Sequence, residues 1–261
     1  MHIVVLAKPV PDTTGQERLT ADGRLDRAAV PAVVNANDEY ALEAALKLVE
    51  GSPDGGEVTV LAMAPAGAPE TLRKALAMGA TRAVLVTDPL LEGSCALSTT
   101  RVLAAALRTL TYDLVIAGAD TSDGGGGIVG AGIATLLGLP YLSYAARIEP
   151  AGGRVTVRRL SATGYDVIEA PLPALVVATQ ALGEPRYPSL KGIMSARTKE
   201  MTIRSLSDLD LGDAAVGGSV STTRLTGSRQ PPPRAATRVI RKPAAEAARD
   251  VVDFLVDRRI V

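Results

Sequence analysis

A glycine-rich segment, residues 118–127 with the sequence GADTSDGGGG, has the clearest potential for ligand chemistry in this chain. It follows an apolar run at residues 114–117 and precedes a helical pattern at residues 128–137. Four consecutive glycines allow a ligand to approach the backbone closely, and the first turn of a helix offers unpaired N–H groups at the positive end of its dipole. The segment is therefore a candidate phosphate-binding loop, although glycine-rich turns between a strand and a helix also occur without a ligand.

The side chains that commonly carry catalysis are few and isolated. His2, the single histidine, begins an apolar strand pattern, and Cys95 has no histidine partner to activate it. Asp120 and Asp123 could together hold magnesium, but loop carboxylates more often cap turns and helices. The chain also lacks the Lys-Ser/Thr of a P-loop and a G-x-G-x-x-G motif after its first strand. We therefore expect no catalytic residue, no metal site and no enzymatic activity.

A second stretch, residues 184–194 with the sequence EPRYPSLKGIM, could bind a partner protein. Pro185 and Pro188 fix two backbone angles and remove two hydrogen-bond donors, so we expect neither a helix nor a central strand here. Four large apolar residues nevertheless fall in this surface segment: Tyr187, Leu190, Ile193 and Met194. A rigid exposed loop with apolar anchors is suited to docking, because its order lowers the entropy cost of binding. The alternative is a loop that packs these side chains under the same chain.

Composition indicates which elements must position these stretches. Hydrophobic residues make up 47% of the 261 residues but aromatic residues only 3%, which favours an α/β fold with an aliphatic core. Acidic and basic residues number 28 each, and this balance argues against a nucleic-acid or anionic-membrane partner. One cysteine excludes an internal disulfide, and no apolar run approaches the ~20 residues of a membrane span. The N-terminus lacks a signal-peptide pattern, so we expect a cytoplasmic protein without membrane insertion.

The first half of the chain alternates between strand and helix patterns. Strands are expected at residues 3–7, 57–63, 83–87 and 114–117, and helices at residues 37–49, 68–78, 98–110 and 128–137. This alternation predicts a parallel sheet with right-handed crossovers. If the strand order is 3-2-1-4-5, the carboxyl ends of the first and fourth strands flank a ligand crevice, and Ala7, Met63 and the glycine-rich segment converge there.

The second half has a different character. Strand patterns at residues 141–148, 154–160, 165–169 and 175–179 predict an antiparallel extension of the sheet. From residue 199 the periodicity fades, residues 230–233 have the composition of an extended linker, and an apolar stripe from Ala244 to Leu255 predicts an amphipathic helix. We therefore expect a domain at residues 1–198 and an arm at residues 199–261. The helix of the arm either folds back on the domain or reaches another subunit.

Residues 184–197, EPRYPSLKGIMSAR, closely resemble the hallmark N-E-P-R-Y-x-S-L-x-x-I-M-x-A-K of electron transfer flavoprotein beta subunits. Three shorter matches accompany it: residues 8–12 resemble the V-K-x-V-P-D opening, residues 35–39 the N-x-x-[DEC]-E segment, and residues 77–80 the A-M-G-A segment. The resemblance covers essentially the whole chain. It implies a Rossmann-like, HUP-type adenine-nucleotide-binding domain with an antiparallel extension and a C-terminal arm.

In the family this nucleotide site holds AMP, or a second FAD in electron-bifurcating members. By position, the resemblance implies binding by Leu6, Ala7, Asn35, Met63, Gly118, Asp123, Gly125, Gly126, Gly127, Ile128 and Val129. Common members carry Asp or Asn, then Gln and Thr, where this chain has Gly125 to Val129. Contacts to phosphate would therefore come from backbone N–H groups.

The resemblance also implies partners. An alpha subunit would carry the redox FAD, and the arm would pack on that subunit in a heterodimer. Residues 184–197 would be the recognition loop, with Leu190 entering a pocket on acyl-CoA or related dehydrogenases, as in fatty acid β-oxidation. Electrons would then pass to a membrane quinone oxidoreductase, and this chain would be a carrier subunit in electron transport.

Three other functions fit parts of the pattern. A stand-alone nucleotide sensor of the universal-stress type would need neither the recognition loop nor the arm. An ATP-pyrophosphatase-type ligase would carry its Ser-Gly-Gly loop after the first strand, where this chain has residues 8–12 instead. A beta subunit of an electron-bifurcating flavoprotein would hold a second FAD in place of AMP.

Overall fold

The computed structural model describes residues 1–15, 18–211, 216–229, 232 and 237–261. The chain forms two compact units, Met1–Thr226 and Gly227–Val261. Among the described helices, none combines the length and apolar character that crossing a bilayer would require. The first unit is an α/β fold, as the sequence predicts.

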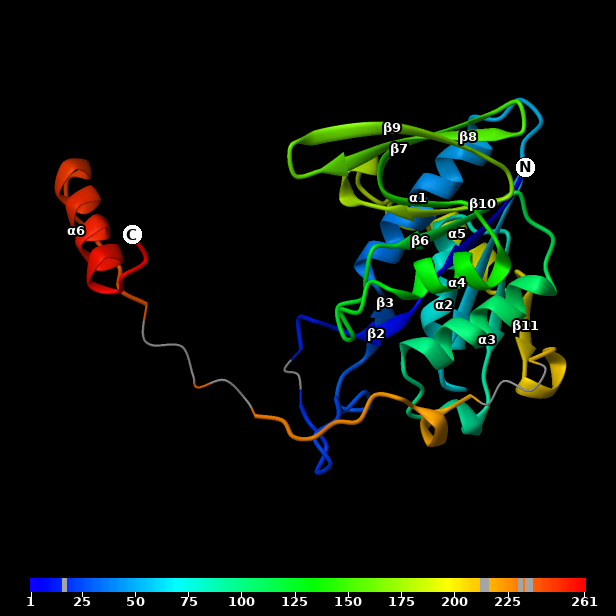
Figure 1. Cartoon of the computed structure of the whole chain (residues 1–261), viewed down its shortest axis with the longest axis horizontal. Coiled ribbons are helices and arrows are strands. Elements are labelled where there is room, and N and C mark those ends of the chain that lie inside the picture. The colour runs from blue at the N-terminus through cyan, green and yellow to red at the C-terminus, as the bar shows by residue number, and fades with distance from the viewer. Residues whose placement is uncertain (16–17, 212–215, 230–231, 233–236) are drawn as a thin grey trace. The chain divides into compact units, whose positions relative to one another are not determined.

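A nine-stranded sheet forms the centre of the first unit (Figure 1). Its order is β11 (Met201–Arg204), β5 (Arg82–Val86), β4 (Glu57–Met63), β1 (His2–Leu6), β6 (Leu114–Gly118), β10 (Ala174–Ala178), β7 (Tyr141–Ala151), β8 (Arg154–Ser161) and β9 (Gly164–Pro171). Neighbours are parallel from β11 to β7, and β7, β8 and β9 pair antiparallel. A small antiparallel sheet joins β2 (Pro9–Pro11) to β3 (Ala32–Val34).

Helices cover both faces of the parallel strands. Their bounds are α1 (Ala36–Glu50), α2 (Pro69–Met78), α3 (Ala96–Arg108), α4 (Val129–Leu137) and α5 (Leu190–Ala196), with 3₁₀ turns at Pro89–Leu91, Gln180–Leu182, Leu206–Asp208 and Gly218–Val220. Successive strand residues point to opposite faces. Ile3 and Val5 therefore enter the core that α1 and α2 cover, whereas Val4 enters the core under α3 and α4, which lie side by side in Figure 1.

Two strands differ from the sequence-based expectation. The run at residues 175–179 was expected in the antiparallel extension, but β10 lies between β6 and β7 and pairs parallel with both. All five of its residues are buried, which is typical of a parallel strand covered on both faces. No strand was expected after residue 198, yet β11 pairs parallel with β5, and the first unit accordingly continues to Thr226.

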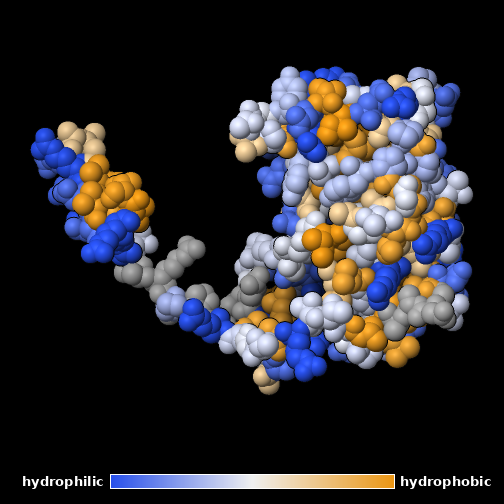
Figure 2. Space-filling view, viewed as in Figure 1, coloured by the Kyte–Doolittle hydropathy of each residue, from blue (hydrophilic) through white to orange (hydrophobic). Residues whose placement is uncertain are grey.

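The second unit contains the helix that the sequence predicts. α6 spans Ala244–Asp257 and presents exposed Val251, Val252 and Phe254. Figure 2 shows hydrophobic side chains gathered along one side of this helix. Of the linker predicted at residues 230–233, all but Pro232 lie outside the described residues. That the helix packs on another subunit stays a prediction.

Candidate functional site

The strands whose carboxyl ends were predicted to flank a ligand crevice are neighbours in the sheet. β1 lies between β4 and β6, so the ends of these strands bring Ala7, Met63 and Gly118 to one edge of the sheet. Leu6 and Ala7 are each only 7% exposed, and their side chains enter opposite hydrophobic cores. They can therefore border a ligand with their backbone but not with their side chains.

Asn35 ties the glycine-rich loop to the start of α1. Its Nδ2 donates to the carbonyl oxygen of Asp120 at 2.8 Å, and its Oδ1 accepts from the N–H of Ser122 at 3.2 Å. The side chain is 1% exposed. Asn35 thus lies beside the loop, with both ends of its amide engaged in holding that loop in place.

Gly118, the last residue of β6, packs closely against the start of α1. A Cβ on this glycine would overlap the Asp38 carboxylate and lie 2.7 Å from the carbonyl carbon of Asn37. Asp38 in turn accepts a hydrogen bond from the backbone N–H of Lys8 at 2.8 Å. The glycine is therefore needed for the packing of β6 against α1, independently of any ligand.

Asp123 forms ion pairs with two basic side chains, Lys8 and Arg27. Its carboxylate, 2% exposed, accepts a hydrogen bond from Lys8 Nζ at 2.9 Å and also pairs with Arg27. Burial alone would raise the pKa of Asp123, but the hydrogen bond and charge of Lys8, with hydrogen bonds from Thr121 and Arg27, lower it to about 2. An ionised carboxylate repels phosphate, so Asp123 serves the site by holding two positive groups beside the loop.

Lys8 and Arg27 were not among the residues predicted for this site. Lys8 directly follows the end of the first strand and Asp123 follows the fourth, and adjacent parallel strands place such residues together. That signal was available in the sequence. Arg27 lies within residues 13–33, which have little periodic pattern from which the position of its side chain could be predicted.

The end of the glycine loop offers free hydrogen-bond donors. Within the described residues, the backbone N–H groups of Gly126, Gly127, Ile128 and Val129 have no acceptor, whereas the N–H of Gly125 donates to Thr121. Gly125 and Gly127 adopt φ values of +55° and +61°, which favour glycine. Free donors at the start of α4 are available to an anion, and Lys8 and Arg27 are held by Asp123 of the same loop.

Asp38 should make stability depend on pH. Burial raises its pKa to about 7, although hydrogen bonds from Lys8, Asn35 and Gly118 and the charge of Lys8 favour the ionised form. The folded protein then holds a proton that the unfolded chain releases near the ordinary aspartate pKa of 3.8, so this contribution to stability is lost as pH rises from 3.8 to about 7.

The Asp38→Asn variant should therefore gain stability relative to the parent as the pH rises from 4.5 to 7.5, by on the order of 3 kcal/mol. Urea unfolding at both pH values measures this difference. Asp120→Asn, a substitution at an exposed carboxylate in the same region, is the control. Parallel stability profiles for Asp38→Asn and the parent would contradict the prediction.

The segment predicted to dock a partner is exposed, but its second half is a helix rather than the expected loop. Ser189 caps α5, because its Oγ accepts from the N–H of Gly192 at 3.1 Å, and Pro188 lies before the cap, where a missing N–H costs nothing. A Cβ on Gly192 would overlap the carbonyl oxygen of Ala77, so the glycine allows α5 to pack directly on α2. Tyr187 is 95% and Leu190 76% exposed.

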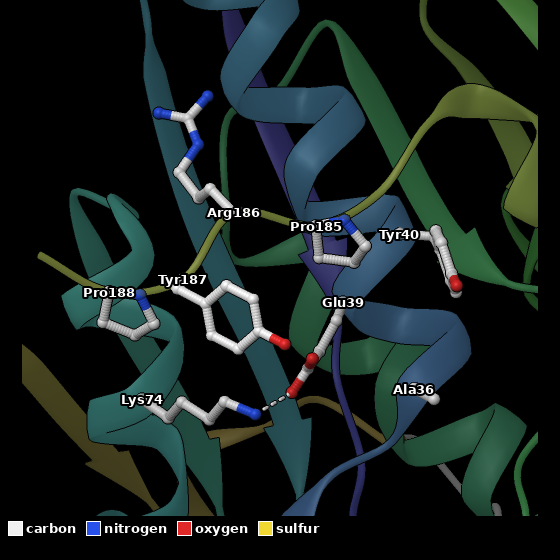
Figure 3. A pocket seen from close by; sticks show the side chains of 8 residues that line it. All are labelled: Ala36, Glu39, Tyr40, Lys74, Pro185, Arg186, Tyr187 and Pro188. Atoms are coloured by element: carbon white, nitrogen blue, oxygen red, sulfur yellow. Dashed lines mark hydrogen bonds and ion pairs between the residues drawn. The ribbon is translucent and has the colours of Figure 1, made fainter.

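All four predicted docking residues are exposed, since Ile193 and Met194 are also on the surface. Beside Tyr187 lies a small surface pocket of about 170 Å³ formed by α1, α2 and residues 185–188. Figure 3 shows the Tyr187 ring next to the ion pair between Lys74 and Glu39, while Arg186 points away from that pair. The alternative of a segment tucked under the chain is therefore wrong.

The isolated titratable residues lie elsewhere. His2 Nε2 contacts Thr59 Oγ1 at 2.8 Å at the opposite end of the strands, and Cys95 precedes α3. Within the described residues there is no group of three or more His, Cys, Asp or Glu side chains that could hold a metal ion.

The chain is similar to known proteins along its full length. It matches the sequence profile of the electron transfer flavoprotein domain over residues 22–209. It is 40% identical over 266 residues to the electron transfer flavoprotein subunit beta of Mycobacterium tuberculosis, covering 100% of this chain and 99% of that protein. It is 38% identical to the same subunit of Clostridium acetobutylicum and 36% identical to the caffeyl-CoA reductase-Etf complex subunit CarD of Acetobacterium woodii, with both chains fully covered in each comparison.

Proposed function

Since this chain belongs to the family of electron transfer flavoprotein beta subunits, we propose that it forms a heterodimer with an alpha subunit and carries electrons from a flavin dehydrogenase to a quinone oxidoreductase. An FAD held mainly by the alpha subunit would supply the redox chemistry. This chain contributes a nucleotide site and a docking surface, and acts in the cytoplasm as a carrier without a catalytic residue of its own.

The exposure of four apolar side chains in residues 184–197, called the recognition segment below, is the observation that carries this proposal. Tyr187, Leu190, Ile193 and Met194 are large apolar side chains on a segment that a capped helix and two prolines keep ordered. An apolar cluster of this kind on an ordered surface is characteristic of a protein-docking site. An acyl-CoA dehydrogenase or a related flavin dehydrogenase is the proposed partner.

The free donors of the glycine-rich loop support a role in binding the phosphate of an adenine nucleotide. Four free backbone N–H groups can donate to phosphate oxygens, and the two cations held by Asp123 lower the cost of bringing in a dianion. No hydroxyl or amide side chain is needed for this mode of binding. We therefore propose AMP for the crevice, with Ile128 and Val129 donating through their backbone. The contacts of Asn35 and Met63 with the nucleotide stay a prediction.

A second candidate function, as the beta subunit of an electron-bifurcating flavoprotein, has one specific observation in its favour. The similarity to a subunit of a caffeyl-CoA reductase-Etf complex suggests an assembly with a reductase that acts on a CoA ester. In that case the crevice of this chain would hold a second FAD in place of AMP, as in electron-bifurcating members of the family.

Co-purification from the native host followed by an absorption spectrum and nucleotide extraction separates these cases. We expect a yellow heterodimer with one FAD and one AMP. Two FAD per heterodimer would support the bifurcating alternative. A colourless homodimer containing ATP would contradict the electron-carrier assignment and favour a nucleotide sensor.

A further inference from the structure

Arg186 connects the recognition segment to α1 through two carboxylates. Its Nε donates to Glu43 Oε2 at 2.8 Å, its backbone N–H donates to the same oxygen at 3.1 Å, and one terminal nitrogen reaches Glu43 Oε1 at 3.3 Å. The two terminal nitrogens also donate to Glu50, at 2.5 and 2.8 Å. The planar guanidinium thus bridges two acids of one helix.

The positions of the two acids explain this geometry. Glu43 and Glu50 are seven residues apart in α1, so they lie on one face of the helix, two turns from each other. α1 itself packs against the sheet through buried Leu42 and Leu46, and this makes it a rigid base. Arg186 therefore fixes the chain at residue 186 to an element that cannot easily move.

The burial of these groups differs along the contact. The Glu43 side chain is 4% exposed and that of Arg186 33%, whereas Glu50 is 54% exposed. Burial alone would raise the pKa of Glu43, but the hydrogen bonds and charge of Arg186 lower it. The Glu43 half of the contact is consequently the stronger, since a partly desolvated charge pair is screened less than an exposed one.

The contact of Arg186 with α1 lies close in the chain to the exposed apolar residues Tyr187 and Leu190. Tyr187 follows Arg186 directly and is 95% exposed, and Leu190 begins α5 only four residues after Arg186. Figure 3 shows the Arg186 and Tyr187 side chains leaving the backbone in different directions. With Arg186 held on α1 and Gly192 packed on α2, the segment between them is fixed at both ends.

We propose that Arg186, held by Glu43 and Glu50, is a positioning residue that pre-orders the recognition segment for its dehydrogenase partner. This inference rests on the proposed docking function of Leu190. An ordered segment loses less conformational freedom on association than a mobile one, so the contact should increase the affinity for the partner and leave the electron-transfer step unchanged.

The test uses the heterodimer, with an acyl-CoA dehydrogenase and its acyl-CoA as electron donor. Arg186→Gln should raise the KM for the heterodimer about tenfold and leave kcat within about twofold, because ordering affects association only. Arg186→Lys should behave like Arg186→Gln, since the single nitrogen of an ammonium cannot reproduce the planar fork that donates to both oxygens of Glu43 and of Glu50. Hydrogen exchange of residues 184–197 should be faster in both variants and unchanged in the control Arg82→Gln, which removes the Arg82–Glu57 pair between the first residues of β5 and β4.

Arg186→Gln leaves a buried carboxylate without its main partner and could prevent folding. Glu50→Gln is therefore the second variant, because Glu50 is exposed and its replacement removes half of the contact without burying a charge. We expect a KM increase of about threefold with an unchanged unfolding midpoint. A KM equal to that of the parent in both Arg186→Gln and Glu50→Gln would overturn the inference.

Combining Arg186→Gln with Leu190→Ala separates this inference from the function on which it rests. If Arg186 acts through the placement of Leu190, the double variant should have a KM close to that of Leu190→Ala alone. Additive effects would overturn the positioning role while leaving docking intact. An unchanged KM in Leu190→Ala alone would instead show that the docking function has failed.

Discussion

Replacing Leu190 by alanine is expected to raise the KM of the donor dehydrogenase for the heterodimer about thirtyfold, the effect of losing a central apolar anchor worth about 2 kcal/mol. Leu190 is 76% exposed and makes little contribution to its own fold, so stability and flavin content should not change. The measurement is the rate of heterodimer reduction by an acyl-CoA dehydrogenase at increasing heterodimer concentration.

The matched control is Leu97→Ala, which truncates an exposed leucine in the first turn of α3, outside the recognition segment. Its KM should equal that of the parent. If Leu190→Ala and Leu97→Ala have the same KM, the docking assignment is wrong, and the exposed apolar residues of the segment need another explanation.

Replacing Gly118 by alanine is expected to lower the free energy of unfolding by about 3 kcal/mol, at the upper end of the usual cost of overpacking. The added methyl group would overlap the Asp38 carboxylate and lie 2.7 Å from the carbonyl carbon and 2.9 Å from the Cβ of Asn37. The carboxylate could turn aside only by giving up its hydrogen bond from Lys8, and the backbone of α1 cannot retreat without disturbing the core.

Urea unfolding of Gly118→Ala against Gly126→Ala tests this explanation. No described atom lies within 4 Å of a Cβ at Gly126, so that substitution should change stability by less than about 0.5 kcal/mol. A loss at Gly126 as large as that at Gly118 would indicate a general effect of glycine removal rather than a steric one.

The sequence by itself determined most helices and strands of the first half of the chain and the edge of the sheet at which the glycine loop lies. Continuous apolar runs such as Ile3 to Leu6 identify buried parallel strands, and the helices between them fix the crossover direction. The position of the glycine loop after the fourth strand then placed it beside Ala7 and Met63. The exposure of the apolar side chains in residues 184–194 could also be predicted, because prolines exclude regular structure over the first part of that segment.

Only the tertiary structure decided how distant segments meet. β10 enters between β6 and β7, although its apolar run alone does not distinguish a central parallel strand from an antiparallel one. β11 extends the sheet beside β5 from a region of the sequence without a periodic pattern. The helix α5 was missed because its cap, Ser189, follows a proline, and its packing on α2 depends on a glycine 115 residues after Ala77.

The charge pairs at the glycine loop and at residue 186 also join segments that are far apart in the sequence. Lys8 meets Asp123 across 115 residues, and Arg186 meets Glu43 across 143. Local periodicity reports which face of an element is buried, because burial follows the repeat of that element. It carries no information about which of 28 basic residues will reach a given carboxylate, since that choice depends on the order of strands and the path of the connections. The fold fixes that order, and with it the two cations paired with Asp123 and the arginine paired with Glu43.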